Sequence, residues 1–158
     1  MILYHSSNHD FDKIECKKSG TISTFLGNEK VHREGIFLTN NQRFSSIYGK
    51  ITYTIDADIK NILDLTNGFL YEDIEKLKHK LNERWMESIN PHDIWNIFDG
   101  ENAKLVVSSL KKIGYDSALI KEQCPKSGNI YDTYVVFDEK KLKIINKQSN
   151  IKKRKIKP

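Results

Sequence analysis

Short runs of apolar residues with alternating or continuous patterns gather toward the two ends of the chain. Ile51–Ile55 alternates at period two, which predicts a half-buried strand. Tyr134–Phe137 is an unbroken run of aromatic and β-branched residues, which is typical of a buried strand. This run belongs to a strand predicted at residues 133–138. Similar patterns predict further strands at residues 2–5, 35–39, 117–121 and 142–145.

The middle of the chain has a helical pattern instead. Apolar residues recur there at spacings of three and four, on one face of an amphipathic helix: Leu70, Ile74, Leu77, Leu81, Trp85 and Ile89. Further helices are predicted at 91–98, after Asn90-Pro91, and at 101–113, ended by Gly114. Shorter ones are predicted at 10–19 and, capped by Asn40-Asn41, at 44–48, with a loop at 21–34. Because the strands are grouped and do not alternate with helices, the pattern favours an α+β fold.

Length and composition predict one globular, soluble domain. The chain has 158 residues, of which 38% are hydrophobic and 30% charged. No run approaches the ~20 apolar residues of a membrane-spanning helix, and no apolar segment of a secretory signal follows the first Met. Cys16 and Cys124 lie far apart without a paired spacing, so we expect no disulfide and a cytoplasmic location.

The positive charge is concentrated at the end of the chain. The net charge is +5, yet residues 146–158 hold six basic residues and no acidic one, so the rest carries −1. We therefore expect a domain over residues 1–145 and a basic, disordered tail over 146–158. Residues 147–157 form either a solvated tail, which can bind polyanions non-specifically, or a specific nucleic-acid arm.

Several common chemistries are excluded by the motifs that the chain lacks. The five His residues show no Cys/His pairing with the spacing of a zinc site, so no metal site is predicted. There is no glycine-rich phosphate loop of either common type and no GxSxG nucleophile motif.

Four segments, taken in order, carry a resemblance. They are LYHSS from Leu3, GIFLTNNQRFSSIYG from Gly35, GYDSALI from Gly114 and YVVFDEKKLKI from Tyr134. Together they resemble the ADP-ribosyltransferases of the poly(ADP-ribose) polymerase and diphtheria-toxin type, especially small single-domain versions from phages and bacteria. The resemblance implies two small, mostly antiparallel sheets around an NAD cleft, with the helical segment as an insertion.

The resemblance also implies roles for residues of the first two motifs. His5 and Ser7 would position the NAD ribose, and Ser6 with Ser45 would hold the nicotinamide carboxamide. The family normally has Gly at the position of Ser6. The ring of Tyr48 would stack on nicotinamide. Phe37, which replaces a family Tyr and lacks its hydroxyl, would form the wall of the cleft.

The catalytic acid is where the chain departs from the family. Thr133 stands where the resemblance implies a catalytic Glu. Asp132 is a candidate, but strand alternation turns it to the opposite face from Thr133. A hairpin between 117–122 and 133–138 that closes directly over its loop would place Glu122 opposite Thr133 with Cβ atoms ~5 Å apart. We favour Glu122 as the acid, with Asp132 and the absence of any acid as alternatives.

The functional expectation is a mono-ADP-ribosyltransferase that uses NAD as co-substrate. Cleavage of NAD passes through an oxocarbenium-like state that a carboxylate stabilises. The acceptor is an unidentified protein or nucleic acid, and chain elongation is disfavoured without a Glu at position 133. A role in phage–host conflict, as a toxin or as an inhibitor of a defence system, is implied by the resemblance alone. Two alternatives stay open: an NAD glycohydrolase, and a non-catalytic module that binds nucleic acid or protein.

Overall fold

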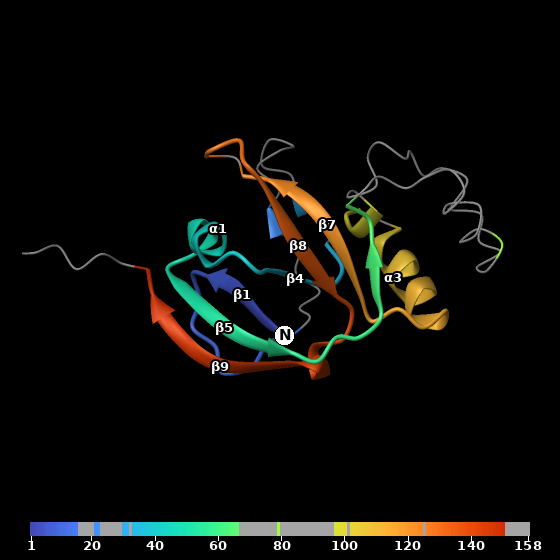
Figure 1. The fold of residues 1–158 in the computed structure, drawn as a ribbon, viewed down its shortest axis with the longest axis horizontal. Helices are drawn as coiled ribbons and strands as arrows, with labels where there is room; N and C mark the ends of the chain where they lie inside the picture. Colours follow the sequence, from blue (N-terminus) through green and yellow to red (C-terminus); the bar gives the residue numbers. More distant parts are fainter. Residues whose placement is uncertain are drawn as a thin grey trace, which may run out of the picture.

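The computed structural model describes residues 1–15, 21–22, 30–31, 33–66, 79, 97–100, 102–124 and 126–150. Seven strands form one mixed sheet in the order β6-β7-β8-β4-β1-β5-β9 (Figure 1). Their bounds are β1 Ile2–Ser7, β4 Ile36–Thr39, β5 Ile51–Ala57, β6 Ile62–Asp64, β7 Ser117–Gln123, β8 Ile130–Val136 and β9 Leu142–Ser149. β2 (Thr21–Ile22) and β3 (Lys30–Val31) pair separately.

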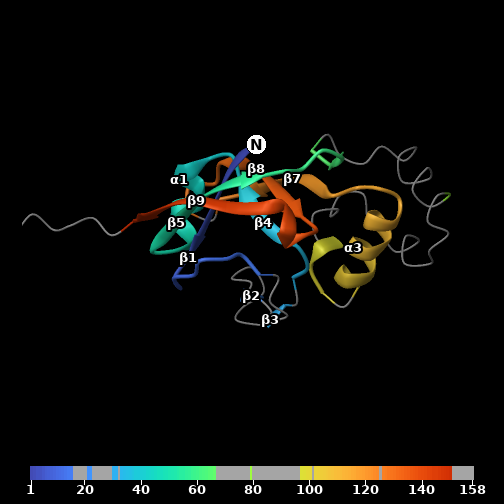
Figure 2. The ribbon, with the colours of Figure 1, turned by 90° about the horizontal axis from the view of Figure 1, so that it is seen from below.

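Helices are few in the part of the chain that the structure describes. α1 (Gln42–Ser45) continues into the 3₁₀ turn η2 (Ser46–Tyr48), and α3 (Ala103–Lys112) precedes β7. A second 3₁₀ turn, η5 (Glu139–Lys141), joins β8 to β9. Figure 2 shows the twisted sheet from another side, with α1 and α3 at its two ends.

The predicted pair of sheets around a cleft is wrong. β1 and β4 pair through Tyr4 and Thr39, and this contact joins β6-β7-β8-β4 to β1-β5-β9 in one continuous sheet. The sheet is mixed because β6 pairs with β7 in parallel, whereas the other strand pairs are antiparallel. The number of sheets depends here on the pairing of Tyr4 with Thr39, which are 35 residues apart. Sequence patterns predict the strands themselves but carry no signal for this pairing.

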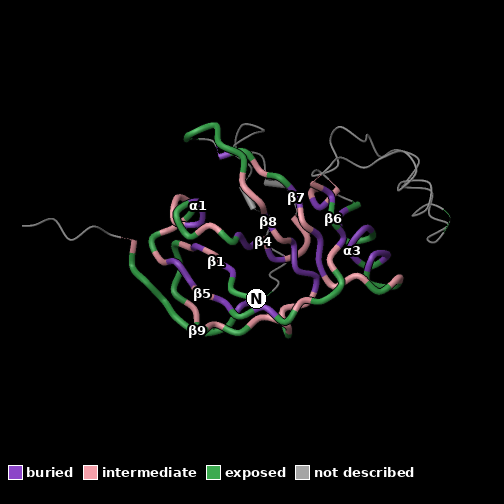
Figure 3. Tube along the Cα trace, viewed as in Figure 1, coloured by how far each residue is buried: buried purple, intermediate pink, exposed green. Residues whose placement is uncertain are grey.

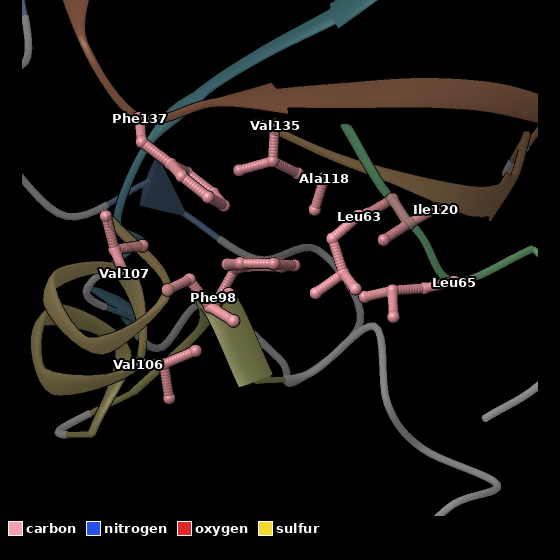
Figure 4. Close-up of a cluster of buried hydrophobic side chains, with 10 residues drawn as sticks. Leu63, Leu65, Phe98, Val106, Val107, Ala118, Ile120, Val135 and Phe137 are labelled. Atoms are coloured by element: carbon pink, nitrogen blue, oxygen red, sulfur yellow. The ribbon is translucent and has the colours of Figure 1, made fainter. Parts of the chain in front are cut away.

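One hydrophobic core lies between α3 and the strands next to it. Phe98 is fully buried at its centre, with Val106 and Val107 of α3 on one side and Val135 of β8 and Leu63 of β6 on the other (Figure 4). The segment before β4 is connected to this core by a backbone hydrogen bond from the amide of Glu34 to the carbonyl of Phe98, at 3.0 Å. This core fixes the start of β4 against the residues that precede α3.

A second core lies under β1 and β5. Tyr53 is fully buried and stacks on Phe11, with ring centroids 4.1 Å apart. The Tyr53 hydroxyl donates to the carbonyl of His9 and accepts from the amide of Phe11. The N-terminal segment therefore lies across the sheet in an extended form, and the helix predicted at 10–19 is wrong over residues 10–15, which are its described part.

The short helix after β4 begins at a cap that the sequence predicts. The side chain of Asn41 accepts a hydrogen bond from the amide of Phe44 and caps α1. At the end of η2, a Cβ on Gly49 would lie 2.4 Å from backbone atoms of Ser7. Only glycine allows β1 and the start of β5 to approach this closely.

Other expectations differ in their bounds. The helix predicted at 101–113 forms as α3, and Gly114 after it has a φ of +102°. β9 continues four residues past the expected domain boundary at 145, and β6 has no counterpart in the prediction. The helices predicted at 70–89 and 91–98 fall almost entirely outside the described residues. No helix among the described residues is long and apolar enough to cross a membrane.

Burial decreases from the middle of the sheet to its edge. The central strands and the inner side of α3 are buried, whereas β9 and the tip of the β7–β8 hairpin are exposed (Figure 3). Polar side chains at the ends of these strands therefore lie where the buried sheet meets solvent.

Candidate functional site

The β7–β8 hairpin brings Glu122 to Thr133. Thr133 Oγ1 donates a hydrogen bond to Glu122 Oε2 at 2.7 Å. The strands pair with Ile120 opposite Thr133 and Glu122 opposite Tyr131, so the predicted register was wrong by two residues. A shift of two keeps both side chains on the same face, and the diagonal neighbours still meet. The carboxylate therefore reaches the position of Thr133, as expected from the sequence.

Asp132 is turned away from this pair. It forms an ion pair with its strand neighbour Lys121, with 2.6 Å between Nζ and Oδ1. Its backbone carbonyl accepts a hydrogen bond from Thr39 Oγ1. Successive side chains of a strand point to opposite faces, so Asp132 cannot share a site with Thr133.

Arg33 joins the pair from the segment before β4. Its guanidinium makes two hydrogen bonds to Asp99, at 2.7 and 3.0 Å, and Nη1 lies 3.8 Å from Glu122 Oε1. The same group lies over the ring of Phe37, 4.2 Å from its centroid. Burial lowers the pKa of Arg33, but its bonds to Asp99 outweigh this effect and the net pKa is raised. Arg33 is thus a fixed positive charge between two carboxylates.

Tyr48 lies near the same carboxylate. Desolvation raises the pKa of Tyr48 to about 12, and the negative charge of Glu122 adds to the rise. The ring is 49% exposed and its edge packs on Phe44, which in turn stacks on Tyr131 of β8 with centroids 4.4 Å apart. A half-exposed, neutral aromatic ring beside a carboxylate is a suitable surface for stacking a flat ligand.

His5 follows Tyr4, the residue of β1 that pairs with Thr39 of β4. Its Nδ1 is 3.1 Å from the carbonyl oxygen of Phe37, and a carbonyl only accepts, so Nδ1 carries a proton. Burial lowers the pKa of His5, against the opposing effect of this hydrogen bond. The ring is therefore neutral at physiological pH, and Nε2 is left as a hydrogen-bond acceptor.

Four polar side chains form a hydrogen-bonded chain from α1 to the end of the sheet. Ser45 and Ser6 are 2.9 Å apart, Ser6 and Thr52 are 2.7 Å apart, and Thr52 donates to Asn150 Oδ1 at 3.0 Å. The amide of Asn150 is oriented by Nδ2, which donates to the carbonyl of Gly49.

The direction of each bond follows from the end of this chain. A hydroxyl has one hydrogen, and that of Thr52 is used on Asn150, so Ser6 must donate to Thr52 and Ser45 must donate to Ser6. Ser45 is 2% exposed and keeps only acceptor capacity. Ser45 can therefore accept a hydrogen bond from the NH₂ of a carboxamide, but it cannot donate one to the carboxamide oxygen.

No family model matches the chain, and no curated protein does. One solved structure is similar: the crystal structure of an anti-CRISPR protein. The similarity covers 94% of this chain and 95% of the other, with a TM-score of 0.50 and 13% identical residues. At this identity the comparison supports the fold alone. It extends over nearly the whole of both chains, and so supports the single mixed sheet over the two-sheet architecture that we expected.

The predicted residues fall into connected groups. His5 contacts Phe37 through its carbonyl, and the Phe37 ring contacts Arg33, which reaches Glu122 and through it Thr133. Ser6 and Ser45 form their own buried pair. Ser7 instead accepts a hydrogen bond from the amide of His9 in an exposed turn.

Four residues of the site were missed by the sequence analysis: Arg33, Asp99, Thr52 and Asn150. Arg33 lies in a segment taken as a loop, and its partner Asp99 is 66 residues away, a pairing that no local pattern encodes. Asn150 lies within the expected tail. Among the described residues, no three His, Cys, Asp or Glu side chains are arranged to hold a metal ion.

Proposed function

We propose that the protein is an NAD-dependent mono-ADP-ribosyltransferase with Glu122 as its catalytic carboxylate. The observation that supports this proposal is the 2.7 Å hydrogen bond from Thr133 to Glu122, because Thr133 stands where the resemblance implies a catalytic Glu. The proposal depends on this group of side chains and not on the fold.

The chemistry requires negative charge near the ribose. When the bond between ribose and nicotinamide breaks, its electron pair leaves with nicotinamide and the ribose becomes an oxocarbenium-like cation. Glu122 stabilises that cation, because a fixed carboxylate interacts more strongly with a full positive charge than with neutral ribose. The acceptor then forms the new bond to ribose and loses its proton.

The other side chains fit parts of NAD. Tyr48 offers a half-exposed ring for nicotinamide, and Nε2 of His5 accepts a hydrogen bond from a ribose hydroxyl. Ser45 accepts from the carboxamide NH₂, in line with the direction of the hydroxyl chain. Ser6 adds nothing with its side chain, because that hydrogen is used on Thr52.

For the acceptor we propose a macromolecule of a defence complex in the cytoplasm. The chain shares its fold with an anti-CRISPR protein, which makes a CRISPR system the first place to test for this target. Residues 151–158 contain five basic residues and no acidic one, so the preceding 150 residues are neutral overall. A charge distribution of this kind favours contact with a polyanion, such as the RNA of a ribonucleoprotein.

The test is transfer of label from NAD labelled in its adenylate half, in bacterial lysate, to a band on a denaturing gel. We expect a labelled band with the natural sequence and a loss of at least about 100-fold with Glu122→Gln, within the 10²–10³-fold cost of removing one electrostatic group from an active site. The matched control is Glu15→Gln, which changes an exposed carboxylate. Equal labelling by all three proteins would refute the role of Glu122. Free ADP-ribose without a labelled band would indicate an NAD glycohydrolase.

A second candidate is a binding protein that inhibits its target without NAD. It is favoured by the contacts that already hold Glu122, one to Thr133 and one to Arg33, and by the commitment of the Ser45 hydrogen to Ser6. Inhibition of a CRISPR nuclease in NAD-free buffer, unchanged by Glu122→Gln, would establish this candidate and refute the transferase.

A further inference from the structure

Arg33 poses a problem for a carboxylate that must stabilise a cation. Its guanidinium lies 3.8 Å from Glu122, and a full ion pair there would cancel the charge that the reaction needs. Such a pair would form at about 2.8 Å. The distance in the structure is about 1 Å longer, so the guanidinium is held short of full contact.

Asp99 is what holds it. Nε and Nη2 of Arg33 bind the two oxygens of Asp99, and backbone pairing between the same two residues forms an isolated bridge. The side chain of Asp99 is only 15% exposed, and its neighbour Phe98 is anchored in the core. Two parallel hydrogen bonds fix the plane of a guanidinium, so only Nη1 remains directed toward Glu122.

The charges support the same interpretation. Asp99, Arg33 and Glu122 together carry a net charge of −1. With Arg33 neutralised by Asp99, the remaining negative charge is that of Glu122, which has Thr133 as its hydrogen-bond donor. We infer that Asp99 is a positioning residue that keeps Arg33 from closing on Glu122 and so leaves this carboxylate free to stabilise a cationic transition state. This inference rests on the proposed transferase activity.

The experiment compares four variants in NAD turnover: Asp99→Asn, Asp99→Asn with Arg33→Met, Arg33→Lys, and the control Asp56→Asn. Asp56 pairs with the N-terminal amine at the exposed end of β5, away from the site. We expect Asp99→Asn to lower kcat at least tenfold with little change in KM, because Arg33 then pairs with Glu122. Adding Arg33→Met should restore most of kcat, since the uncharged side chain can still cover Phe37. If Asp99 had only a structural role, removing Arg33 from the Asp99→Asn protein would not restore kcat.

Arg33→Lys covers the case in which Asp99→Asn does not fold. An ammonium cannot be held in a fixed plane by Asp99, so this variant should also lose kcat. If the unaltered protein turns over NAD and Asp99→Asn matches Asp56→Asn, or if the double variant stays as inactive as Asp99→Asn, the inference fails and the proposed function stands.

A crystal structure of the Asp99→Asn protein, or of Arg33→Lys, separates the two ideas when there is no turnover at all. Closure of residue 33 onto Glu122 to hydrogen-bond distance would support the positioning role, although the proposed function would have failed. A separation of 3.8 Å or more between residue 33 and Glu122 would overturn the positioning role.

Discussion

The hydroxyl chain from Ser45 to Asn150 can be tested by removing its middle member. Thr52→Val replaces a hydroxyl with a methyl group of nearly the same size at a site that is 1% exposed. Two hydrogen bonds disappear, one of 2.7 Å to Ser6 and one of 3.0 Å to Asn150. Ser6 can turn its hydrogen to Ser45 by reversing that bond, so the main losses are the donor to Asn150 Oδ1 and the acceptor for the hydrogen of Ser45.

Asn150 is only partly buried, so the Ser45 hydroxyl accounts for most of the cost, and leaving one buried polar atom without a partner costs about 1–3 kcal/mol. For a chain of this length each kcal/mol shifts Tm by about 2–4 °C, so the middle of the range predicts a fall of about 4–8 °C. Circular dichroism during heating measures Tm, and urea unfolding provides an independent estimate of the free energy of unfolding.

Thr54→Val is the matched control, since Thr54 lies two residues along β5 on the same face and makes no side-chain hydrogen bond to a described residue. It should change Tm by no more than about 2 °C, which corresponds to the ±0.5 kcal/mol typical of substitutions away from such features. In a double-mutant cycle, Thr52→Val and Asn150→Ala should be clearly less than additive, because each removes the same bond. Equal Tm values for the Thr52 and Thr54 variants, or full additivity with Asn150→Ala, would refute the hydroxyl chain.

Further predictions concern the first core, two glycines, Asp116 and the basic tail. Phe98→Ala should cost about 3–5 kcal/mol in urea unfolding because it empties the centre of the first core, whereas Leu105→Ala, at an exposed position on α3, should cost under about 1 kcal/mol. Gly49→Ala should lower Tm by more than Gly114→Ala, because its Cβ meets the backbone of Ser7 while the space around Gly114 is open; the reverse order would contradict the close approach. Burial raises the pKa of Asp116, but bonds from two backbone amides and Lys141 outweigh it, so the net pKa is lowered. Its stabilising effect is therefore present above the unfolded value of about 3.9 and is lost as pH falls through the folded pKa, a dependence that Asp116→Asn should reduce in acid unfolding. Deleting residues 151–158 should abolish salt-sensitive binding to RNA, and unchanged binding would exclude the tail as the contact.

The strands were predictable because each is a local pattern. The alternation of Ile51–Ile55 and the run at Tyr134–Phe137 correspond to β5 and to the end of β8. Glu122 and Thr133 lie on one face of the hairpin, as predicted, although the register differs from the predicted one by two residues. A shift by an even number of residues leaves each side chain on the same face.

What could not be predicted depends on contacts between distant segments. The number of sheets depends on the pairing of Tyr4 with Thr39, and the charge beside Glu122 depends on the pairing of Arg33 with Asp99. The helix predicted at 10–19 does not form over residues 10–15, where Phe11 stacks on Tyr53 and where an isolated helix of this length is marginal in water. In each case tertiary packing overrides the local preference.

The order of the strands has a consequence for how the chain is made. β1 precedes the other described strands along the chain, and β4 and β5, which lie on either side of it, end by residue 57. The outer partners of these two strands are β8 and β9, which come from the last fifth of the described chain. Until those strands leave the ribosome, β4 and β5 each have an open edge that pairs readily with other chains. We therefore expect the nascent protein to depend on chaperones until β8 and β9 have been made, and refolding from denaturant to be slow and sensitive to protein concentration.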